Sequence, residues 1–167
     1  MSRRVADSSG KARSICVVRR ADSRAPETLR LVERLWGELG SLYPEMKGPP
    51  TAPDEIVGER ASFVVAWVKG EPVGCGAFRP LSEDENNVAE IKRMYVEPTM
   101  RRRGISRSIL IGLEKLARDC GYTIVRLETG LRQPNAIRLY ETSGYHRIEP
   151  FGRYRDDPLS VCFEKSL

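Results

Sequence analysis

The spacing of hydrophobic positions changes several times along the chain, and each change marks an expected element. Apolar residues recur every three or four positions over residues 25–40 and 105–117, which predicts two amphipathic helices. The second pattern stops before Gly121, a residue suited to a helix C-terminus. A third, short helix is expected within residues 134–145, because a proline opens this segment and a glycine follows its polar end.

Runs of β-branched and apolar residues fill most of the remaining chain and predict strands. Lys69-Gly70 joins two of them as a hairpin. The expected strands cover 15–20, 62–68, 71–80, 88–96 and 123–129, with a closing antiparallel pair over 145–156 and 160–164. Strands that alternate with helices indicate an α/β fold.

Length and charge indicate one domain and a tail. A chain of 167 residues is long enough for a single core, which we assign to residues 15–167. The net charge of +5 resides in the first twenty residues. We expect residues 1–14 to form a disordered basic tail; because it lacks interleaved aromatic residues, a nucleic-acid partner is not expected.

Composition favours a cytoplasmic protein. The chain has no run of about 18 apolar residues and no apolar secretory segment, so no membrane association is expected. Its four cysteines lie far apart and it has one histidine, so we expect neither disulfides nor a metal site. Cys162 could act as a nucleophile, but no histidine motif accompanies it.

The most informative stretch follows the strand 88–96. It reads Arg101-Arg102-Arg103-Gly104-Ile105-Ser106-Arg107, a basic glycine turn that opens the helix 105–117. A helix N-terminus presents unpaired N–H groups and partial positive charge, which suits phosphate. The nucleoside-triphosphate loop is excluded because no Gly-Lys-Ser/Thr ending is present, and the segment 74–79 lacks the third glycine of a dinucleotide fingerprint.

The pattern Arg101-x-x-Gly104-x-Ser106 resembles the Gln/Arg-x-x-Gly-x-Gly/Ala signature of the GNAT superfamily of acyl-CoA-dependent N-acyltransferases, with serine at the last position. The resemblance spans residues 60–167 in the right order. It implies a mixed central sheet flanked by helices and an N-acetyltransferase with acetyl-CoA as co-substrate and no metal. It also implies that the turn binds the pyrophosphate, while the backbone of Met94, Tyr95 and Val96 holds the pantetheine arm beside a bulge in a splayed strand.

A charged residue interrupts the expected central strand. Glu90 lies between Ala89 and Ile91, where several family members carry the general base. Burial would raise the pKa of such a carboxylate and suit it to deprotonate an amine. The alternative is a structural carboxylate paired with Lys92, Arg93 or a neighbouring arginine.

A second segment resembles the family element Asn-x-x-Ala-x-x-x-Tyr-x-x-x-Gly-Phe/Tyr. Ala136, Tyr140 and Gly144 match its spacing, whereas Gln133 takes the place of the asparagine and Asn135 follows two residues later. The resemblance implies that Gln133 or Asn135 contacts the cofactor arm. Tyr140 would protonate the departing thiolate, or would be a core aromatic residue.

The acceptor is the least determined part of the prediction. The resemblance implies a small-molecule or peptide amine and leaves a homodimer open, while a non-catalytic acyl-CoA-binding module on the same fold is the alternative. The acceptor wall would come from the variable region near residues 36–55 and from the closing strands. Its candidates are Trp36, Tyr43, Glu45, Asp54, Glu55, Arg153, Tyr154 and Arg155.

Overall fold

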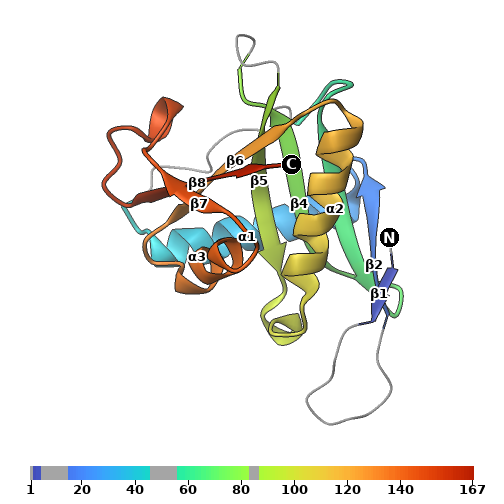
Figure 1. Cartoon of the computed structure of the whole chain (residues 1–167). Helices are drawn as coiled ribbons and strands as arrows, with labels where there is room; N and C mark the ends of the chain where they lie inside the picture. Colours follow the sequence, from blue (N-terminus) through green and yellow to red (C-terminus); the bar gives the residue numbers. More distant parts are fainter. Residues whose placement is uncertain (1, 5–14, 46–55, 83–86) are drawn as a thin grey trace.

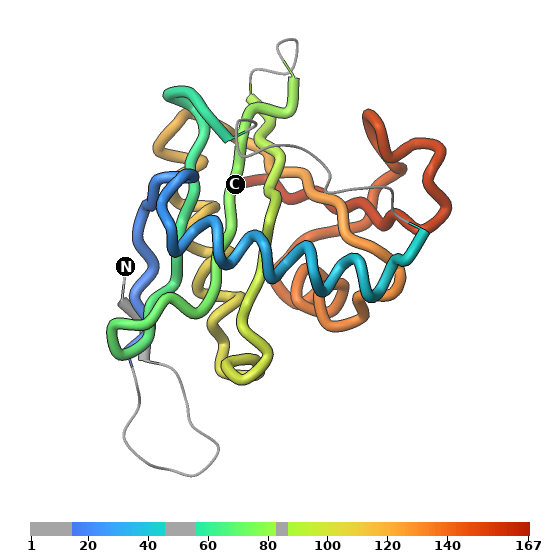
Figure 2. The backbone as a smooth tube through the Cα atoms, turned by 180° about the vertical axis from the view of Figure 1, so that it is seen from behind, coloured from blue at the N-terminus to red at the C-terminus, as the bar shows by residue number. Residues whose placement is uncertain are grey.

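The computed structural model describes residues 2–4, 15–45, 56–82 and 87–167. Within these ranges eight strands form one sheet, and helices cover both of its faces (Figures 1 and 2). The strands are β1 (Ser2–Arg4), β2 (Ile15–Ala21), β3 (Ser62–Val68), β4 (Glu71–Pro80), β5 (Val88–Val96), β6 (Ile124–Gly130), β7 (His146–Ile148) and β8 (Ser160–Ser166). The helices are α1 (Pro26–Leu42), α2 (Ile105–Asp119) and α3 (Pro134–Glu141), with 3₁₀ turns at Pro98–Met100 and Gly152–Tyr154.

The sheet has the order β1-β2-β3-β4-β5-β6-β8-β7. β5 and β6 pair in parallel, and every other neighbouring pair is antiparallel. β8 enters between β6 and β7, so the closing pair lies at one edge of the sheet (Figure 1). The predicted mixed α/β sheet is therefore confirmed, and the segment 74–79 belongs to a strand and not to a dinucleotide loop.

Each face of the sheet has its own apolar cluster. The apolar side of α2 packs on one face with Ile109, Leu110 and Leu113, all nearly inaccessible to solvent. α1 packs on the opposite face through Leu31 and Leu35. Burial of each such side chain contributes about 1.5–3 kcal/mol to the stability of the fold. The apolar residues that recur at helical spacing in the sequence therefore hold both helices on the sheet.

Two predicted segments differ from the structure. Ser2–Arg4, expected in the tail, forms the edge strand β1 against Ile15–Val17, because the outer edge of β2 offers backbone groups that a further strand can pair. The strand expected over 145–156 is confined to His146–Ile148, since Pro150 has no N–H to donate to a ladder. Residues 5–14 of the expected tail lie outside the described residues.

The described helices include none that is both long and apolar enough to cross a membrane. The four cysteines are free thiols, and three of them are buried. Buried thiols of this kind pack as small hydrophobic side chains.

Candidate active site

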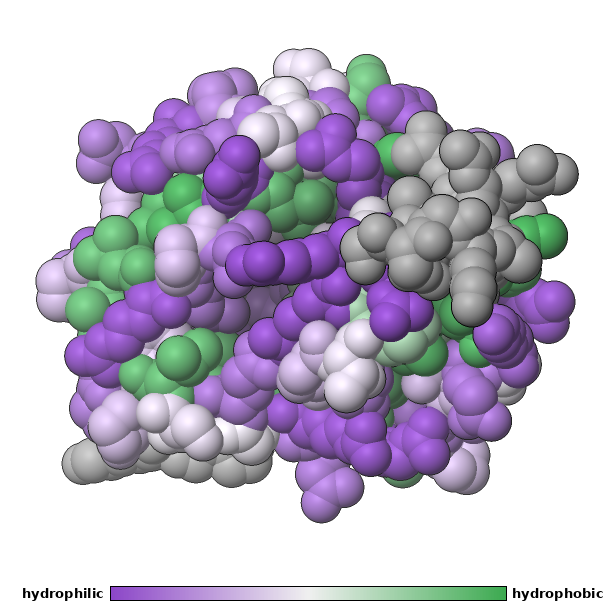
Figure 3. Space-filling view, turned by 90° about the horizontal axis from the view of Figure 1, so that it is seen from below, coloured by the Kyte–Doolittle hydropathy of each residue, from purple (hydrophilic) through white to green (hydrophobic). Residues whose placement is uncertain are grey.

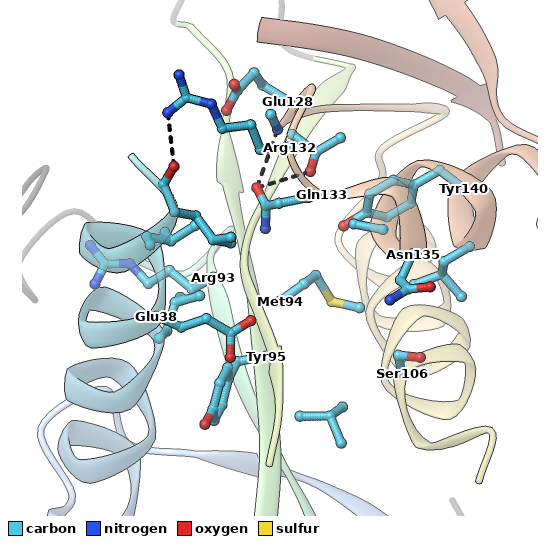
Figure 4. Close-up of a pocket in the computed structure, with 18 of the residues that line it drawn as sticks. Glu38, Arg93, Met94, Tyr95, Ser106, Glu128, Arg132, Gln133, Asn135 and Tyr140 are labelled. Carbon is cyan, nitrogen blue, oxygen red and sulfur yellow. Dashed lines mark hydrogen bonds between the residues drawn. The ribbon is translucent and has the colours of Figure 1, made fainter. Parts of the chain in front are cut away.

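The central strands β5 and β6 pair only over their first halves. Their parallel register joins Val88–Ile91 to Ile124–Leu127 and ends there. A cleft of about 1260 Å³ opens between their second halves. α1 lines it on one side and α2 and α3 line it on the other, so the cleft passes through the sheet (Figure 4).

A β-bulge in β5 accompanies this divergence. The register of β5 against β4 shifts between Lys92 and Tyr95, so that Arg93 and Met94 both lie opposite Gly76. Arg93 has a positive φ of 58°. A bulge bends its strand and interrupts pairing, which explains why β5 leaves β6 at this point, as the family resemblance implied.

The glycine turn lies at the end of β5 and opens α2. Gly104 has φ 77°, a left-handed conformation that glycine adopts without steric cost. The first helical hydrogen bond runs from Ser108 N–H to the Gly104 carbonyl at 3.0 Å. The preceding N–H groups of Ile105, Ser106 and Arg107 therefore lack helical acceptors, which is the geometry that the predicted anion site requires.

Two of the arginines expected at the anion site hold the turn together instead. Arg101 Nε donates to the Val96 carbonyl at 2.9 Å, and its guanidinium also pairs with Glu38 of α1. Arg103 donates to the Thr99 carbonyl at 3.4 Å and does not line the cleft. Their charges fix the loop conformation, so an anion at this turn would depend more on backbone N–H groups than the sequence suggested.

Other cations remain at this end of the cleft. Arg102, Arg107 and Arg138 line it, and Arg107 is positioned by a 2.9 Å hydrogen bond to Thr142 Oγ1. The molecular face seen from below, toward which the turn projects, carries mainly hydrophilic side chains (Figure 3). Arg138 was not among the expected residues, because the family element that this segment resembles specifies no residue type at its position.

The strand residues expected beside the cofactor arm all line the cleft, but their side chains differ in direction. Met94 points toward α2 and α3 (Figure 4). Tyr95 packs in the α1 cluster and donates to Glu97 at 3.3 Å. The Val96 carbonyl accepts a hydrogen bond from Arg101. Among the described residues, no strand pairs with the backbone edge of β5 beyond Ile91 on the β6 side.

Gln133 and Asn135 come from the N-terminus of α3 and both line the cleft. Gln133 Oε1 accepts from Gly130 N–H at 3.2 Å and from the Thr129 hydroxyl at 3.3 Å. Its oxygen is thus committed to the loop, and the NH₂ group is the end that can serve a ligand. Asn135 is exposed and extends from the first turn of α3 (Figure 4).

Tyr140 lies one turn further along α3, with its hydroxyl directed into the cleft (Figure 4). Its ring is buried beside Tyr145 and Phe163. Burial, and secondarily the charge of Glu128, raise the pKa of the Tyr140 phenol. The ring of Tyr140 therefore belongs to the core, as one alternative expected, and its hydroxyl reaches the cleft, while its role as an acid stays a prediction.

Glu90 does not line the cleft. It is 2% exposed and forms ion pairs with Arg79 and Lys92, both at 3.0 Å, while the Tyr154 hydroxyl donates to it at 2.8 Å. Burial raises the pKa of Glu90, but Lys92, the Tyr154 hydroxyl and Arg79 outweigh burial and lower it overall. The expectation of a raised pKa was wrong, and the alternative of a structural carboxylate paired with Lys92 and an arginine is confirmed.

Glu128 of β6 has the properties that were expected of Glu90. It lines the cleft just beyond the last paired residue, Leu127, and accepts a 2.7 Å hydrogen bond from the Ser160 hydroxyl. Burial raises its pKa, and the hydrogen bond from Ser160 and the charge of Lys92 only partly oppose this. Sequence reasoning missed Glu128, although its place at the carboxyl end of a central strand was a usable signal.

The far wall of the cleft comes from α1 and the loops near β8. Trp36, Tyr43 and Glu45 line it, as do Arg153 and Tyr154. The other acceptor candidate of the closing segment, Arg155, is exposed and not among the lining residues. Asp54 and Glu55 lie outside the described residues.

Arg132 joins this wall to the end of β6. Its backbone N–H donates to the Tyr43 hydroxyl at 3.0 Å, and its guanidinium binds the Leu42 carbonyl and Glu45, both at 2.8 Å. A Cβ at Gly130 would lie 1.8 Å from the Tyr43 hydroxyl, so only glycine fits there. The C-terminal end of α1 is thereby fixed over the cleft.

Cys162 is 1% exposed and does not line the cleft. Burial raises the pKa of its thiol. A nucleophilic cysteine needs the opposite, a lowered pKa and access to substrate, so the structure does not support the Cys162 alternative.

Comparison with known proteins identifies the family. The sequence pattern of the acetyltransferase (GNAT) family matches residues 29–145. The IAA acetyltransferase of Azospirillum brasilense is 38% identical over 139 residues, covering 83% of this chain and 90% of that protein. The uncharacterized N-acetyltransferase YsnE of Bacillus subtilis is 34% identical over 117 residues, covering 68% of this chain and 75% of its own.

Solved structures share the fold. A Klebsiella pneumoniae protein assigned as an acyl-CoA N-acyltransferase aligns with a TM-score of 0.76 at 31% identity, covering 91% of this chain and 97% of that one. A GNAT family acetyltransferase from Elizabethkingia anophelis with acetyl-CoA bound aligns with a TM-score of 0.65 at 16% identity, covering 91% and 98%. The chain therefore belongs to the acetyltransferase (GNAT) family and is an acetyl-CoA-dependent N-acetyltransferase.

Proposed function

We propose that this enzyme transfers the acetyl group of acetyl-CoA directly to a primary amine while both substrates occupy the cleft between β5 and β6. The observation that carries the proposal is the continuity of this cleft, which extends from Gly104 at the start of α2 to Tyr43 at the end of α1. A cleft open on both faces of the sheet can admit two substrates from opposite sides. Positioning two reactants in this way contributes about 7–11 kcal/mol to lowering a barrier.

The α2 and α3 side fits the co-substrate. The free N–H groups of Ile105, Ser106 and Arg107 suit a pyrophosphate, and Arg102 and Arg138 add positive charge beside them. The unpaired edge of β5 at Met94–Val96 suits the amide groups of the pantetheine arm, with Gln133 and Asn135 as further polar partners.

Acetyl-CoA supplies an activated thioester, and the protein must handle two protons. An alkylammonium with a pKa near 10 has to lose a proton before it can attack. We assign this role to Glu128, because it reaches the cleft and its raised pKa brings it closer to the working pH. Glu90, which the sequence favoured, is held ionised by Lys92 and Arg79 away from the cleft.

Tyr140 is the proposed acid. Its raised pKa keeps the phenol protonated, and its hydroxyl points into the cleft, where it can donate to the departing thiolate sulfur. A backbone N–H at the β5 bulge, that of Met94, would stabilise the negative charge that develops on the carbonyl oxygen.

The experiment has two stages. Calorimetric titration with acetyl-CoA tests the co-substrate side, and thiol release with a panel of amines then tests transfer. Direct transfer predicts intersecting initial-rate lines, since both substrates must bind before either product leaves. Parallel lines would instead indicate an acetylated enzyme, and binding without transfer to any amine would contradict the proposed function.

A further inference from the structure

Two arginines from different helices line the cleft beside the glycine turn. Arg107 belongs to the first turn of α2 and Arg138 to the last turn of α3. The N-terminal end of α2 lies next to α3 (Figures 1 and 2). This is the side of the cleft opposite the acceptor side, the part that is lined by α1 and by the loops next to β8.

A single threonine holds Arg107 next to the backbone of Arg138. Thr142 Oγ1 accepts a hydrogen bond from the Arg107 guanidinium at 2.9 Å and donates to the Arg138 carbonyl at 2.8 Å. The Arg107 side chain thereby reaches from α2 to the C-terminal end of α3, where helix carbonyls attract a cation. Because a guanidinium has five N–H donors, the bond to Thr142 leaves others for a ligand.

The charges of Arg107 and Arg138 are not neutralised by acidic side chains in the described part of the chain. Neither arginine forms an ion pair with a described residue, and the Arg138 side chain makes no hydrogen bond to one. Glu141, the acidic residue of α3, pairs with Arg147 at 3.0 Å instead. A group of like charges without acidic partners attracts an anionic ligand.

A purely structural role does not account for the Arg138 side chain. A cation in the last turn of a helix can bind the terminal carbonyl groups. In α3 hydroxyls serve these carbonyls: Thr142 donates to Arg138 at 2.8 Å, and Ser143 donates to Leu139 at 2.6 Å. Arg138 itself is exposed and lines the cleft, so its guanidinium is available to a ligand there.

Acetyl-CoA carries more negative charge than the glycine turn can match. Its pyrophosphate diester has about two negative charges, and the phosphate monoester on the 3′ position of its ribose adds about 1.5–2 at pH 7. The N-terminus of α2 supplies a partial charge of roughly +0.5, and Arg102 of the turn adds a full charge. Two further guanidinium groups suit the monoester, because its three oxygens can accept paired hydrogen bonds from more than one arginine.

We infer that Arg107 and Arg138 bind the 3′-phosphate of the co-substrate, so that the enzyme selects acetyl-CoA over thioesters of 3′-dephospho-CoA. The inference rests on the proposed place of acetyl-CoA in the cleft, because it assigns the part of that ligand beyond the pyrophosphate. The 3′-phosphate is remote from the thioester, so its binding contributes to affinity and not to the chemical step.

The first test compares two ligands on the intact protein. Calorimetric titration gives the dissociation constants of CoA and of 3′-dephospho-CoA. We expect the value for dephospho-CoA to be higher on the order of 10-fold, because charge-assisted hydrogen bonds are lost. This ratio should shrink when NaCl is raised from 50 to 500 mM, since both arginines are exposed. Equal affinities at low salt would overturn the inference and leave acetyl-CoA binding at the turn intact.

Variants assign the preference to the two arginines. In Arg107→Gln and in Arg138→Gln the ratio of the two dissociation constants should fall to about two- to threefold. The matched control is Arg118→Gln, which removes an exposed charge from the other end of α2, about 16 Å along the helix. The control should keep the wild-type ratio.

Two results with these variants would overturn the inference. If Arg107→Gln and Arg138→Gln weaken both ligands equally and leave the ratio unchanged, the arginines act on the pyrophosphate or on folding. If Arg118→Gln lowers the ratio as much as they do, the preference reflects net charge and not a site.

Kinetics gives an independent measurement. With acetyl-dephospho-CoA in place of acetyl-CoA, KM should rise by on the order of 10-fold while kcat stays within about twofold, because the lost interaction is the same in the ground state and the transition state. A fall in kcat with an unchanged KM would contradict the inference.

Failure of the inference and failure of the proposed function are distinguishable. Parallel initial-rate lines would contradict direct transfer and leave the preference for the 3′-phosphate standing. If neither CoA nor dephospho-CoA binds the wild type, the proposed co-substrate site fails and the inference fails with it.

Discussion

The two sides of the cleft are built in different ways. The proposed co-substrate side is lined by residues of one contiguous stretch, Arg101–Arg107, and by the start of α3, and its proposed contacts are largely backbone N–H groups. The acceptor side assembles side chains from α1, β5, β6 and the loops around residues 132 and 153–159. The co-substrate side can be recognised in the sequence as a short motif, whereas the acceptor side is assembled only when the chain folds.

This difference also separates two uses of arginine. Arg101 and Arg103 belong to the motif but are bound to protein carbonyls and to Glu38, so they hold a loop in shape. Arg93 lies outside the motif and faces the cleft because a bulge turned it. The direction that the backbone gives a charged side chain therefore decides whether it reaches the cleft.

The largest expected effect concerns the chemistry between the two sides. Glu128→Gln should lower kcat on the order of 10²- to 10⁴-fold, because it removes a general base, while acetyl-CoA affinity stays within about threefold. Stopped assays of thiol release and calorimetry measure the two quantities. A fall in acetyl-CoA affinity that accounts for the whole loss would contradict the base assignment.

The same residue predicts a pH dependence. Because burial raises the pKa of Glu128, the acidic limb of kcat/KM should lie above the ordinary glutamate value of about 4.3. Activity should decline as the pH falls through this raised pKa, since the protonated carboxyl cannot accept a proton. Glu128→Gln should lack that limb in a profile measured from pH 5 to 9.

The next largest effect is expected from a substitution that impairs acetyl-CoA binding alone. Gly104→Glu places a side chain at φ 77° and a negative charge before the helix N-terminus, so acetyl-CoA affinity should fall about 100-fold or more. Gly104→Asn is the matched control, because asparagine tolerates left-handed backbone and no atom lies within 4 Å of a Cβ there. Equal losses in both variants would indicate strain and not anion repulsion.

A third variant tests whether Glu90 is structural. Glu90→Gln leaves Lys92 and Arg79 without their carboxylate, which should lower the free energy of unfolding by about 3 kcal/mol at pH 7. The pKa of Glu90 is lowered on folding, so its contribution is present above the unfolded-state value of about 4.3 and lost as the pH falls through the lower folded-state pKa.

Urea unfolding of the wild type and Glu90→Gln at pH 7 and pH 3.5 measures this contribution. The difference in stability between the two proteins should narrow at the lower pH. If Glu90→Gln were as stable as the wild type and had a much lower kcat, Glu90 would instead have a role in catalysis.

The smallest expected effect is confined to the acceptor wall. Tyr43→Phe removes the hydroxyl that accepts from Arg132 N–H at 3.0 Å, a bond worth about 1 kcal/mol. KM for the amine should rise about three- to tenfold with little change in acetyl-CoA affinity. A shift in acetyl-CoA affinity would show that the two sides are coupled through the loop at Gly130.

The sequence by itself determined the mixed α/β fold, the glycine turn and the candidate Tyr140. These follow from local rules: hydrophobic periodicity sets the elements, and a glycine before a helix sets a turn with free N–H groups. Gln133, Asn135 and most of the turn were accordingly found where they were expected.

Only the tertiary structure decided which carboxylate faces the cleft and which arginine turns toward it. Glu90 and Glu128 each lie near apolar residues in a strand, and their pKa values move in opposite directions because Lys92 and Arg79 surround the first and a hydroxyl meets the second. One extra residue in β5 directs Arg93 toward α1. Such outcomes depend on which side chains the fold brings together, such as Arg79 with Glu90 and Ser160 with Glu128, and local sequence does not decide this.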